Sequence, residues 1–121
     1  MEKSNNLVKL FLMRAKRNLI IEVDKNDLRN SFFELKKMKQ FQPLLSSYEW
    51  NKNGLCIKLE LEINDLIFNH QVSQYGNYLY INNMKEDYEN MLDIDTIKLI
   101  DQMISNFIQF NMSKQKVKTI K

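Results

Sequence analysis

The chain of 121 residues has the length of one domain, and its hydrophobic share (44%) and charged share (27%) match an ordinary globular protein rather than a disordered one. Its only cysteine, Cys56, excludes an internal disulfide and therefore a secreted disulfide scaffold, and no apolar run reaches the length of a membrane span. We therefore expect a cytoplasmic protein with a single domain over residues 1–113 and a basic, frayed tail over residues 114–121.

The net charge of +3 hides an uneven distribution along the chain. Residues 1–40 carry ten Lys or Arg against five Asp or Glu, residues 41–95 carry three against nine, and residues 96–121 carry five against one. The chain is thus basic at both ends and acidic in the middle, a pattern that affects the choice of partner more than the fold.

The first predicted element is an amphipathic helix over residues 5–18. Leu7, Phe11 and Ala15 recur there at four-residue steps and share one face. The apolar run that follows, residues 19–23, fits either the end of this helix or a short strand, and the sequence leaves both open.

A second helix is predicted over residues 27–41, where apolar residues again recur at helical spacing. Asn26 or Asp27 is the expected N-cap, since short polar side chains accept hydrogen bonds from the first free amides of a helix. Pro43 is expected to end the helix.

The middle of the chain is predicted to form an antiparallel sheet. Residues 55–63 alternate between apolar and polar side chains, which is typical of a half-buried strand, and the apolar set is Leu55, Ile57, Leu59, Leu61 and Ile63. We expect residues 47–50 to be its partner strand across a turn at 51–54, and further strands over residues 66–72 and 78–81, joined by a turn that contains Gly76.

The last third is predicted to be helical again, with a short helix over residues 84–92 and a long one over 96–112 capped by Asp93 or Asp95. The apolar residues of the long helix cover about half of its circumference at about 100° per residue. One sheet face needs a narrower stripe, so this helix either lies between two layers of the same chain or shares its extra face with a second copy. We therefore predict a homodimer through residues 96–112.

The expected fold class is α+β, because the predicted strands follow one another and the helices flank them. The expected architecture is an antiparallel β-meander of three to four strands, with the two N-terminal helices and the long C-terminal helix packed on one face.

The chain shows no pattern of a catalytic site. His70 lacks ligand or nucleophile partners, and Cys56 is expected on a half-exposed strand beside Lys58. The best carboxylate cluster (Glu60, Glu62 and Asp65) fits the solvated face of a strand, and Asp93 and Asp95 fit helix caps. No glycine-rich phosphate loop exists. We therefore expect no enzyme activity, no cofactor and no metal.

The favoured function is binding to another protein. Exposed aromatic side chains anchor protein interfaces, and acidic ones beside them suit a basic partner. The candidate residues for this interface are Tyr48, Trp50, Tyr75, Tyr78, Glu86, Asp87 and Glu89. The abundance of Asn, Lys and Ile indicates an AT-rich genome, from which we hypothesise a phage or mobile-element accessory or inhibitor protein that blocks a host or defence factor handling nucleic acid.

The alternative is binding to DNA or RNA without sequence preference, through phosphate contacts from the basic ends. The candidate residues for this function are Lys9, Arg14, Lys16, Arg17, Lys36, Lys37, Lys39, Lys114, Lys116 and Lys118. Lysines greatly outnumber arginines, which are the usual readers of bases, so sequence-specific recognition is not expected.

Overall fold

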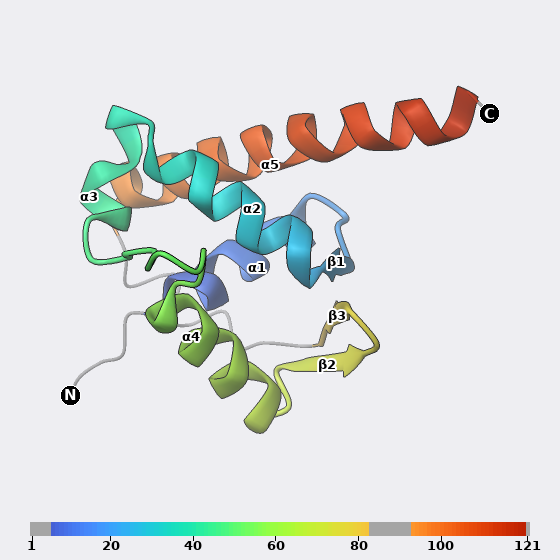
Figure 1. Ribbon diagram of the computed structural model, residues 1–121, viewed down its shortest axis with the longest axis horizontal. Coiled ribbons are helices and arrows are strands. Elements are labelled where there is room, and N and C mark those ends of the chain that lie inside the picture. The colour runs from blue at the N-terminus through green and yellow to red at the C-terminus, as the bar shows by residue number, and fades with distance from the viewer. Residues whose placement is uncertain (1–5, 83–92, 121) are drawn as a thin grey trace.

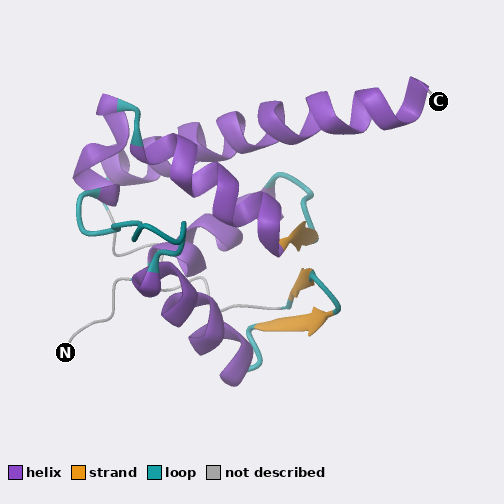
Figure 2. Cartoon of the chain, viewed as in Figure 1, coloured by secondary structure: helices purple, strands orange, loops and turns teal. Residues whose placement is uncertain are grey.

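The computed structural model describes the chain over residues 6–82 and 93–120, and its side chains as far as Asn111. The elements in chain order are α1 (Leu7–Arg17), β1 (Glu22–Asp24), α2 (Lys25–Lys36), the 3₁₀ turn η1 (Lys39–Phe41), α3 (Gln42–Leu45), α4 (Ile57–Phe68), β2 (Val72–Tyr75), β3 (Tyr78–Ile81) and α5 (Ile94–Ile120). Helices make up most of the described chain and the strands gather on one side of them (Figures 1 and 2).

The α+β class is confirmed, and the sheet has three antiparallel strands in the order β1-β3-β2. The strands β2 and β3 form a hairpin whose two-residue turn contains Gly76, at φ +60°, a conformation that glycine adopts without strain. The strand β1 pairs with the free side of β3, so the ambiguous run before residue 24 ends in a strand rather than extending α1.

The core forms around α1, which contacts α4, α5 and β3 (Figure 1). The ring of Phe11 meets those of Phe32 in α2 and Phe107 in α5 edge to face, with centroid distances of 5.3 and 5.5 Å. These contacts join the first, second and last helices in one apolar cluster.

The strand predicted over residues 55–63 is wrong, because this segment is the helix α4. Leu59, Ile63 and Leu66 are buried at helical spacing, whereas Ile57 and Leu61 are 54% and 63% exposed. The alternating apolar residues therefore divide between two opposite sides of a helix. Leu, Lys and Glu, which make up six of the nine residues 55–63, have better helix than strand propensities.

Two neighbouring strand predictions fail with it. Residues 47–50 form a loop and not a partner strand, and the segment predicted as a strand over 66–72 contains the end of α4, a turn and only the first residue of β2. The strand over 78–81 is confirmed as β3.

The ends of α2 also differ from the prediction. Asp24 is the N-cap, since its carboxylate accepts hydrogen bonds from the amides of Asn26 and Asp27. The helix ends at Lys36, before Pro43, which lies in the first turn of α3, a position that proline tolerates because the amide there has no helical partner.

The last helix is longer than the predicted 96–112, because it begins at Ile94 and continues through the predicted frayed tail to Ile120, so that its C-terminal end projects past the other described elements (Figure 1). The carboxylate of Asp93 accepts from the amide of Thr96 at 3.3 Å, as expected of a cap. α5 packs against both α1 and α2. The predicted helix over 84–92 lies outside the described residues.

Candidate protein-interaction surface

The outer face of the sheet carries three tyrosines. Side chains alternate between the two faces of a strand, so the register decides which residues lie together. Val23, Val72 and Leu79 point inward and are buried. The opposite face consists of two cross-strand rows, which are Glu22–Tyr80–Ser73 and Asp24–Tyr78–Tyr75. We call these six residues the outer sheet face.

The tyrosines of the outer sheet face are open to solvent. Tyr75 is 65% exposed and Tyr78 is 44% exposed, while Tyr80 is half-buried. The rings of Tyr75 and Tyr80 meet edge to face across the hairpin, with their centroids 5.4 Å apart. Together the three rings present a broad aromatic surface whose hydroxyl groups can also form hydrogen bonds.

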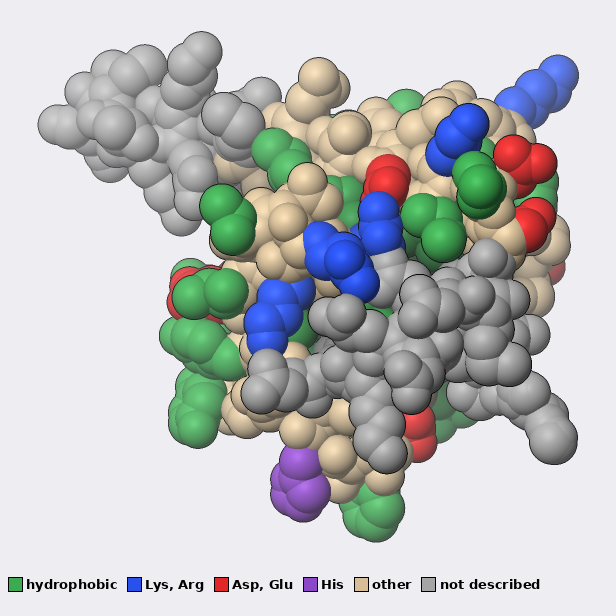
Figure 3. Space-filling view, turned by 180° about the vertical axis from the view of Figure 1, so that it is seen from behind, with side chains coloured by type: hydrophobic (Ala, Val, Ile, Leu, Met, Phe, Trp, Pro, Cys, Tyr) green, Lys and Arg blue, Asp and Glu red, His purple; other side chains and the backbone are tan. Residues whose placement is uncertain are grey.

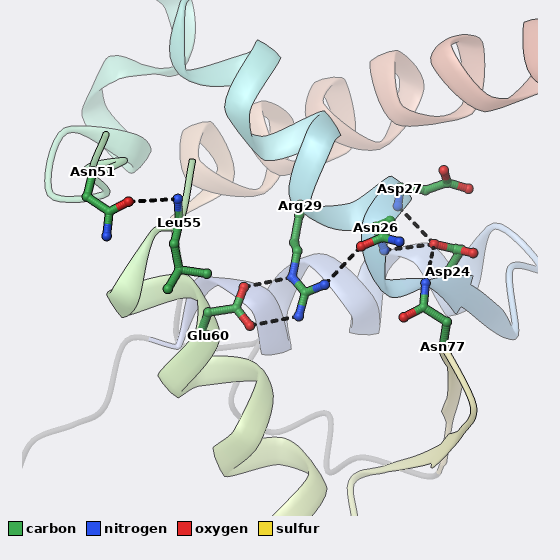
Figure 4. A network of polar contacts seen from close by, with 8 residues as sticks. All are labelled: Asp24, Asn26, Asp27, Arg29, Asn51, Leu55, Glu60 and Asn77. Carbon is green, nitrogen blue, oxygen red and sulfur yellow. Dashed lines mark hydrogen bonds and ion pairs between the residues drawn. The ribbon is translucent and has the colours of Figure 1, made fainter. Parts of the chain in front are cut away.

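Two carboxylates share this face with the tyrosines. The charge of Glu22 raises the pKa of the Tyr80 phenol, as do partial burial and a hydrogen bond between the two side chains, which are neighbours in one cross-strand row. Asp24 is held in place by three donors, because its Oδ1 accepts from the amides of Asn26 (2.7 Å) and Asp27 (3.1 Å) and from the side chain of Asn77 (3.1 Å) (Figure 4). The aromatic surface therefore carries negative charge at fixed positions.

An apolar segment lies just before β1. Leu19 and Ile21 are 89% and 60% exposed, and Leu19 adopts φ +68°, a left-handed conformation that costs free energy for a residue with a branched apolar side chain. In Figure 3, hydrophobic side chains gather along the margin of the molecule that the sheet occupies, and Lys and Arg lie both near the middle of that view and at its upper right edge. Ile21 has the strand parity of the inward Val23, so this exposed apolar segment precedes β1 without belonging to the outer sheet face.

Of the four aromatic residues predicted for the interface, Tyr75 and Tyr78 lie on the outer sheet face, whereas Tyr48 and Trp50 do not. Tyr48 is buried, with 1% of its surface exposed, and therefore cannot meet a partner. Trp50 is half-buried against Phe33, at a centroid distance of 5.6 Å. Their role is to pack the loop between α3 and α4 onto the core.

The phenol of Tyr48 donates a hydrogen bond of 2.6 Å to Oε1 of Glu62, which also accepts from the amide of Val8 at 3.4 Å. Burial raises the pKa of Glu62, although these two hydrogen bonds and the charge of Lys58 act in the opposite direction. Burial and the hydrogen bond to Glu62 also raise the pKa of Tyr48, which keeps the phenol in its donating form. This part-buried pair of Tyr48 and Glu62 joins the loop to α4 and α1.

The predicted carboxylate cluster is dispersed by the helix. Glu60 pairs with Arg29 of α2 through two hydrogen bonds of 2.8 and 2.9 Å (Figure 4). Glu62 instead accepts from Tyr48, so the two carboxylates lie on different sides of α4 and not on one strand face. The pairing with Glu60 raises the pKa of the Arg29 guanidinium. No group of three His, Cys, Asp or Glu side chains within the described residues could hold a metal ion.

The predictions for Cys56 and His70 also change with the fold. Cys56 is buried at the N-terminal end of α4, not half-exposed on a strand beside Lys58. His70 is exposed, but in the turn after α4 at φ +61° rather than on a strand.

Most described cations among the nucleic-acid candidates have partners within the chain. Arg14 forms a bidentate pair with Asp101 at 2.9 Å, and Lys37 pairs with Glu34 at 3.4 Å. Lys16 donates to the carbonyl of Asn82, and Lys36 to those of Leu45 and Ser46. Lys9 and Arg17 also have partners, and Lys39 is exposed.

Some predicted residues fall beyond what the structure describes. Glu86, Asp87 and Glu89 lie outside the described residues, and so do the side chains of Lys114, Lys116 and Lys118 on α5. In their place the structure adds Glu22, Asp24 and Tyr80 to the candidate surface. The alternation of Glu22 and Asp24 around Val23 is the sequence signal that could have identified the strand β1.

Comparison of the chain with protein-family models, curated proteins and solved structures yields no match. Among the described residues, no helix has both the length and the apolar character needed to cross a membrane.

Proposed function

We propose that this protein is a non-catalytic binding module whose outer sheet face docks a basic segment of another protein. The observation that carries the proposal is the pairing of Tyr75, Tyr78 and Tyr80 with Glu22 and Asp24 on one solvent-exposed sheet face. Arginine and lysine side chains bind tyrosine rings through cation–π contacts and bind carboxylates through charged hydrogen bonds.

The sign of the charge favours a basic protein segment over a nucleic acid. Single-stranded nucleic acids also stack on aromatic sheet faces, but there the surrounding charge is positive and neutralises phosphates. The charged groups in the two rows of the outer sheet face are Glu22 and Asp24, which would repel a phosphate backbone.

Nucleic-acid binding through the basic ends is the competing function. It needs cations that are available to phosphates, whereas Arg14 is held in a bidentate pair with Asp101 and Lys36 donates to two backbone carbonyls. This difference supports protein binding as the favoured proposal.

Each contact on the outer sheet face is expected to be modest. An exposed cation–π contact contributes about 0.5–1 kcal/mol, and an exposed ion pair contributes about 0.2–1 kcal/mol. Several such contacts have to act together, so a short peptide should bind in the high micromolar range.

The proposal is tested by titrating an extended peptide of alternating arginine and serine into the ¹⁵N-labelled full chain. Amide shifts should change in β1, β2 and β3, and a peptide of alternating glutamate and serine should leave them unchanged. Glu22→Lys should weaken binding about 5- to 30-fold, through the loss of about 1–2 kcal/mol.

Glu49→Lys is the matched control, because Glu49 is an exposed acid in the loop away from the sheet and its reversal changes the net charge by the same amount. Equal weakening by the two variants, or shifts confined to residues outside the sheet, would rule out the outer sheet face as the docking site.

A further inference from the structure

The helix α4 has a second apolar side that faces solvent. Ile57, Leu61 and Phe68 are 54%, 63% and 80% exposed. At about 100° per residue these three side chains lie within about 40° of one another around the helix axis. Asn64 lies in the same row, between Leu61 and Phe68. We call these four residues the α4 stripe.

Within residues 6–82 and 93–111, the α4 stripe takes no part in the apolar core. The opposite side of α4 buries Leu59, Ile63 and Leu66, and α1 lies behind the helix as it is seen in Figure 1. Single exposed apolar residues are common on protein surfaces, but rows of them are not. A row of large exposed apolar side chains that extends over three helical turns therefore indicates an interaction site.

We propose that the α4 stripe binds the same stripe of a second copy, with the two helices antiparallel about a twofold axis. An isologous interface requires a self-complementary surface, because a residue i that meets residue j of the second copy requires that residue j also meet residue i. A centre between Leu61 and Asn64 places Ile57 against the partner subunit's Phe68, and Leu61 against the partner subunit's Asn64. The apolar side chains of Ile57 and Phe68 then meet at both ends of the stripe, and Leu61 packs beside the partner subunit's Asn64 near the axis.

Charge complementarity favours a second copy in this orientation. Lys58 and Asp65 are exposed and seven residues apart, so they lie on the same flank of the α4 stripe, one near each end. The antiparallel arrangement brings Lys58 beside the partner subunit's Asp65, and the twofold axis repeats this pair. In a parallel pair the twofold axis would put the two copies of this flank on opposite sides of the interface, so Lys58 and Asp65 would not meet.

Both side chains retain capacity for this contact. Lys58 donates to Oγ of Ser47 at 2.6 Å, and an ammonium group has three donors. Asp65 accepts from the side chain of Asn69 through Oδ1 at 3.2 Å, and its carboxylate has further acceptor sites.

The proposed dimer differs from the one that the sequence predicts through residues 96–112. Ile100, Met103, Ile104 and Phe107 are buried within the chain, where α5 packs on α1 and α2. The wide apolar face of this helix is therefore largely used by its own chain, whereas the α4 stripe is not. The stripe is also distinct from the outer sheet face, so the dimer does not depend on the proposed binding function.

The test is sedimentation equilibrium of the full chain over a wide range of concentrations. The wild-type protein should dimerise, and Leu61→Asp should raise the dissociation constant at least about 100-fold. The control is Ile94→Asp, which places the same charge at a 68% exposed apolar residue at the start of α5 and should leave the dissociation constant unchanged.

The charged pair provides the sharper test. Lys58→Glu and Asp65→Lys should each weaken the dimer about tenfold, and the double variant should restore it, a rescue that damage to the fold could not produce. A wild-type protein that stays monomeric, a dimer insensitive to Leu61→Asp, or a double variant no tighter than the single ones would overturn the proposal.

Discussion

Removal of the Tyr48 hydroxyl by Tyr48→Phe is expected to destabilise the fold in a pH-dependent way. The ring would keep its packing, with Phe32 at a centroid distance of 6.3 Å, so the change is confined to the hydrogen bond of 2.6 Å to Glu62. The carboxylate would retain the longer bond of 3.4 Å from the amide of Val8. A part-buried charge would thus lose its shorter hydrogen bond.

The magnitude follows from the charge of the acceptor. A hydrogen bond to an ionised group contributes about 1.5–3 kcal/mol and one between neutral groups about 0.5–1.5 kcal/mol. Glu62 is only part-buried, so we expect about 1.5–2 kcal/mol at neutral pH. The unfolding entropy for a chain of this length is about 0.25 kcal/mol/K, which converts this loss into a decrease of about 6–8 °C in Tm.

The pH dependence follows from the raised pKa of Glu62. An acid whose pKa is higher in the folded state favours folding when protonated, and this contribution is lost as pH rises from its ordinary value of 4.5 through the folded-state value. The cost of Tyr48→Phe should therefore grow over the same interval, because the carboxylate becomes charged. Glu62→Gln, which cannot ionise, should remove this part of the pH dependence.

The assay is thermal unfolding of the wild-type protein, Tyr48→Phe and Glu62→Gln, followed by circular dichroism at several pH values between 4 and 8. A decrease in Tm below about 2 °C at neutral pH, or a decrease of equal size at all pH values, would refute the reasoning about this buried pair.

Three further substitutions test the fold by urea unfolding at low protein concentration. Ile63→Ala should cost about 2–5 kcal/mol and Leu61→Ala less than about 0.5 kcal/mol, because only Ile63 is buried; similar costs would support the strand instead of α4. Asp24→Ala should cost about 0.5–2 kcal/mol through loss of the α2 cap, and no loss would mean that another group caps this helix. Arg29→Met should cost about 0.5–1 kcal/mol in low salt and less in high salt, whereas a cost independent of salt would show that the pair with Glu60 contributes little charge stabilisation.

The sequence predicts the elements whose pattern has one interpretation. The spacing of Leu7, Phe11 and Ala15 fits only a helix, and the apolar stripe of α2 is equally clear. The segment of α4 fits two interpretations, since its leucines and isoleucines satisfy alternation and also divide into a buried row and an exposed row. The prediction of a strand rests on the assumption that every apolar residue of the alternating set is buried. Leu61 does not fit this assumption, because its side chain is 63% exposed on the outer side of α4.

The candidate surface depends on contacts between distant segments. The sequence predicts Tyr75 and Tyr78 for this surface because they belong to a cluster of aromatic residues around the expected strands, which is a local signal. Glu22 joins them only because β1 pairs with β3, and nothing local determines that register. The prediction that Tyr48 lies on the surface is wrong, because its hydroxyl donates to Glu62, fourteen residues away, in a helix that the sequence predicts as a strand.

The most direct test of the proposed function compares the two ligand classes on one protein. Fluorescence anisotropy would follow the binding of the labelled arginine–serine peptide, duplex DNA, single-stranded DNA and RNA at low and moderate salt, for the wild-type chain and Glu22→Lys. We predict that the peptide binds the wild-type chain more tightly than any of the nucleic acids and that Glu22→Lys weakens peptide binding. Tighter binding of a nucleic acid than of the peptide, with steep dependence on salt, would contradict the assignment of the outer sheet face to a basic protein partner.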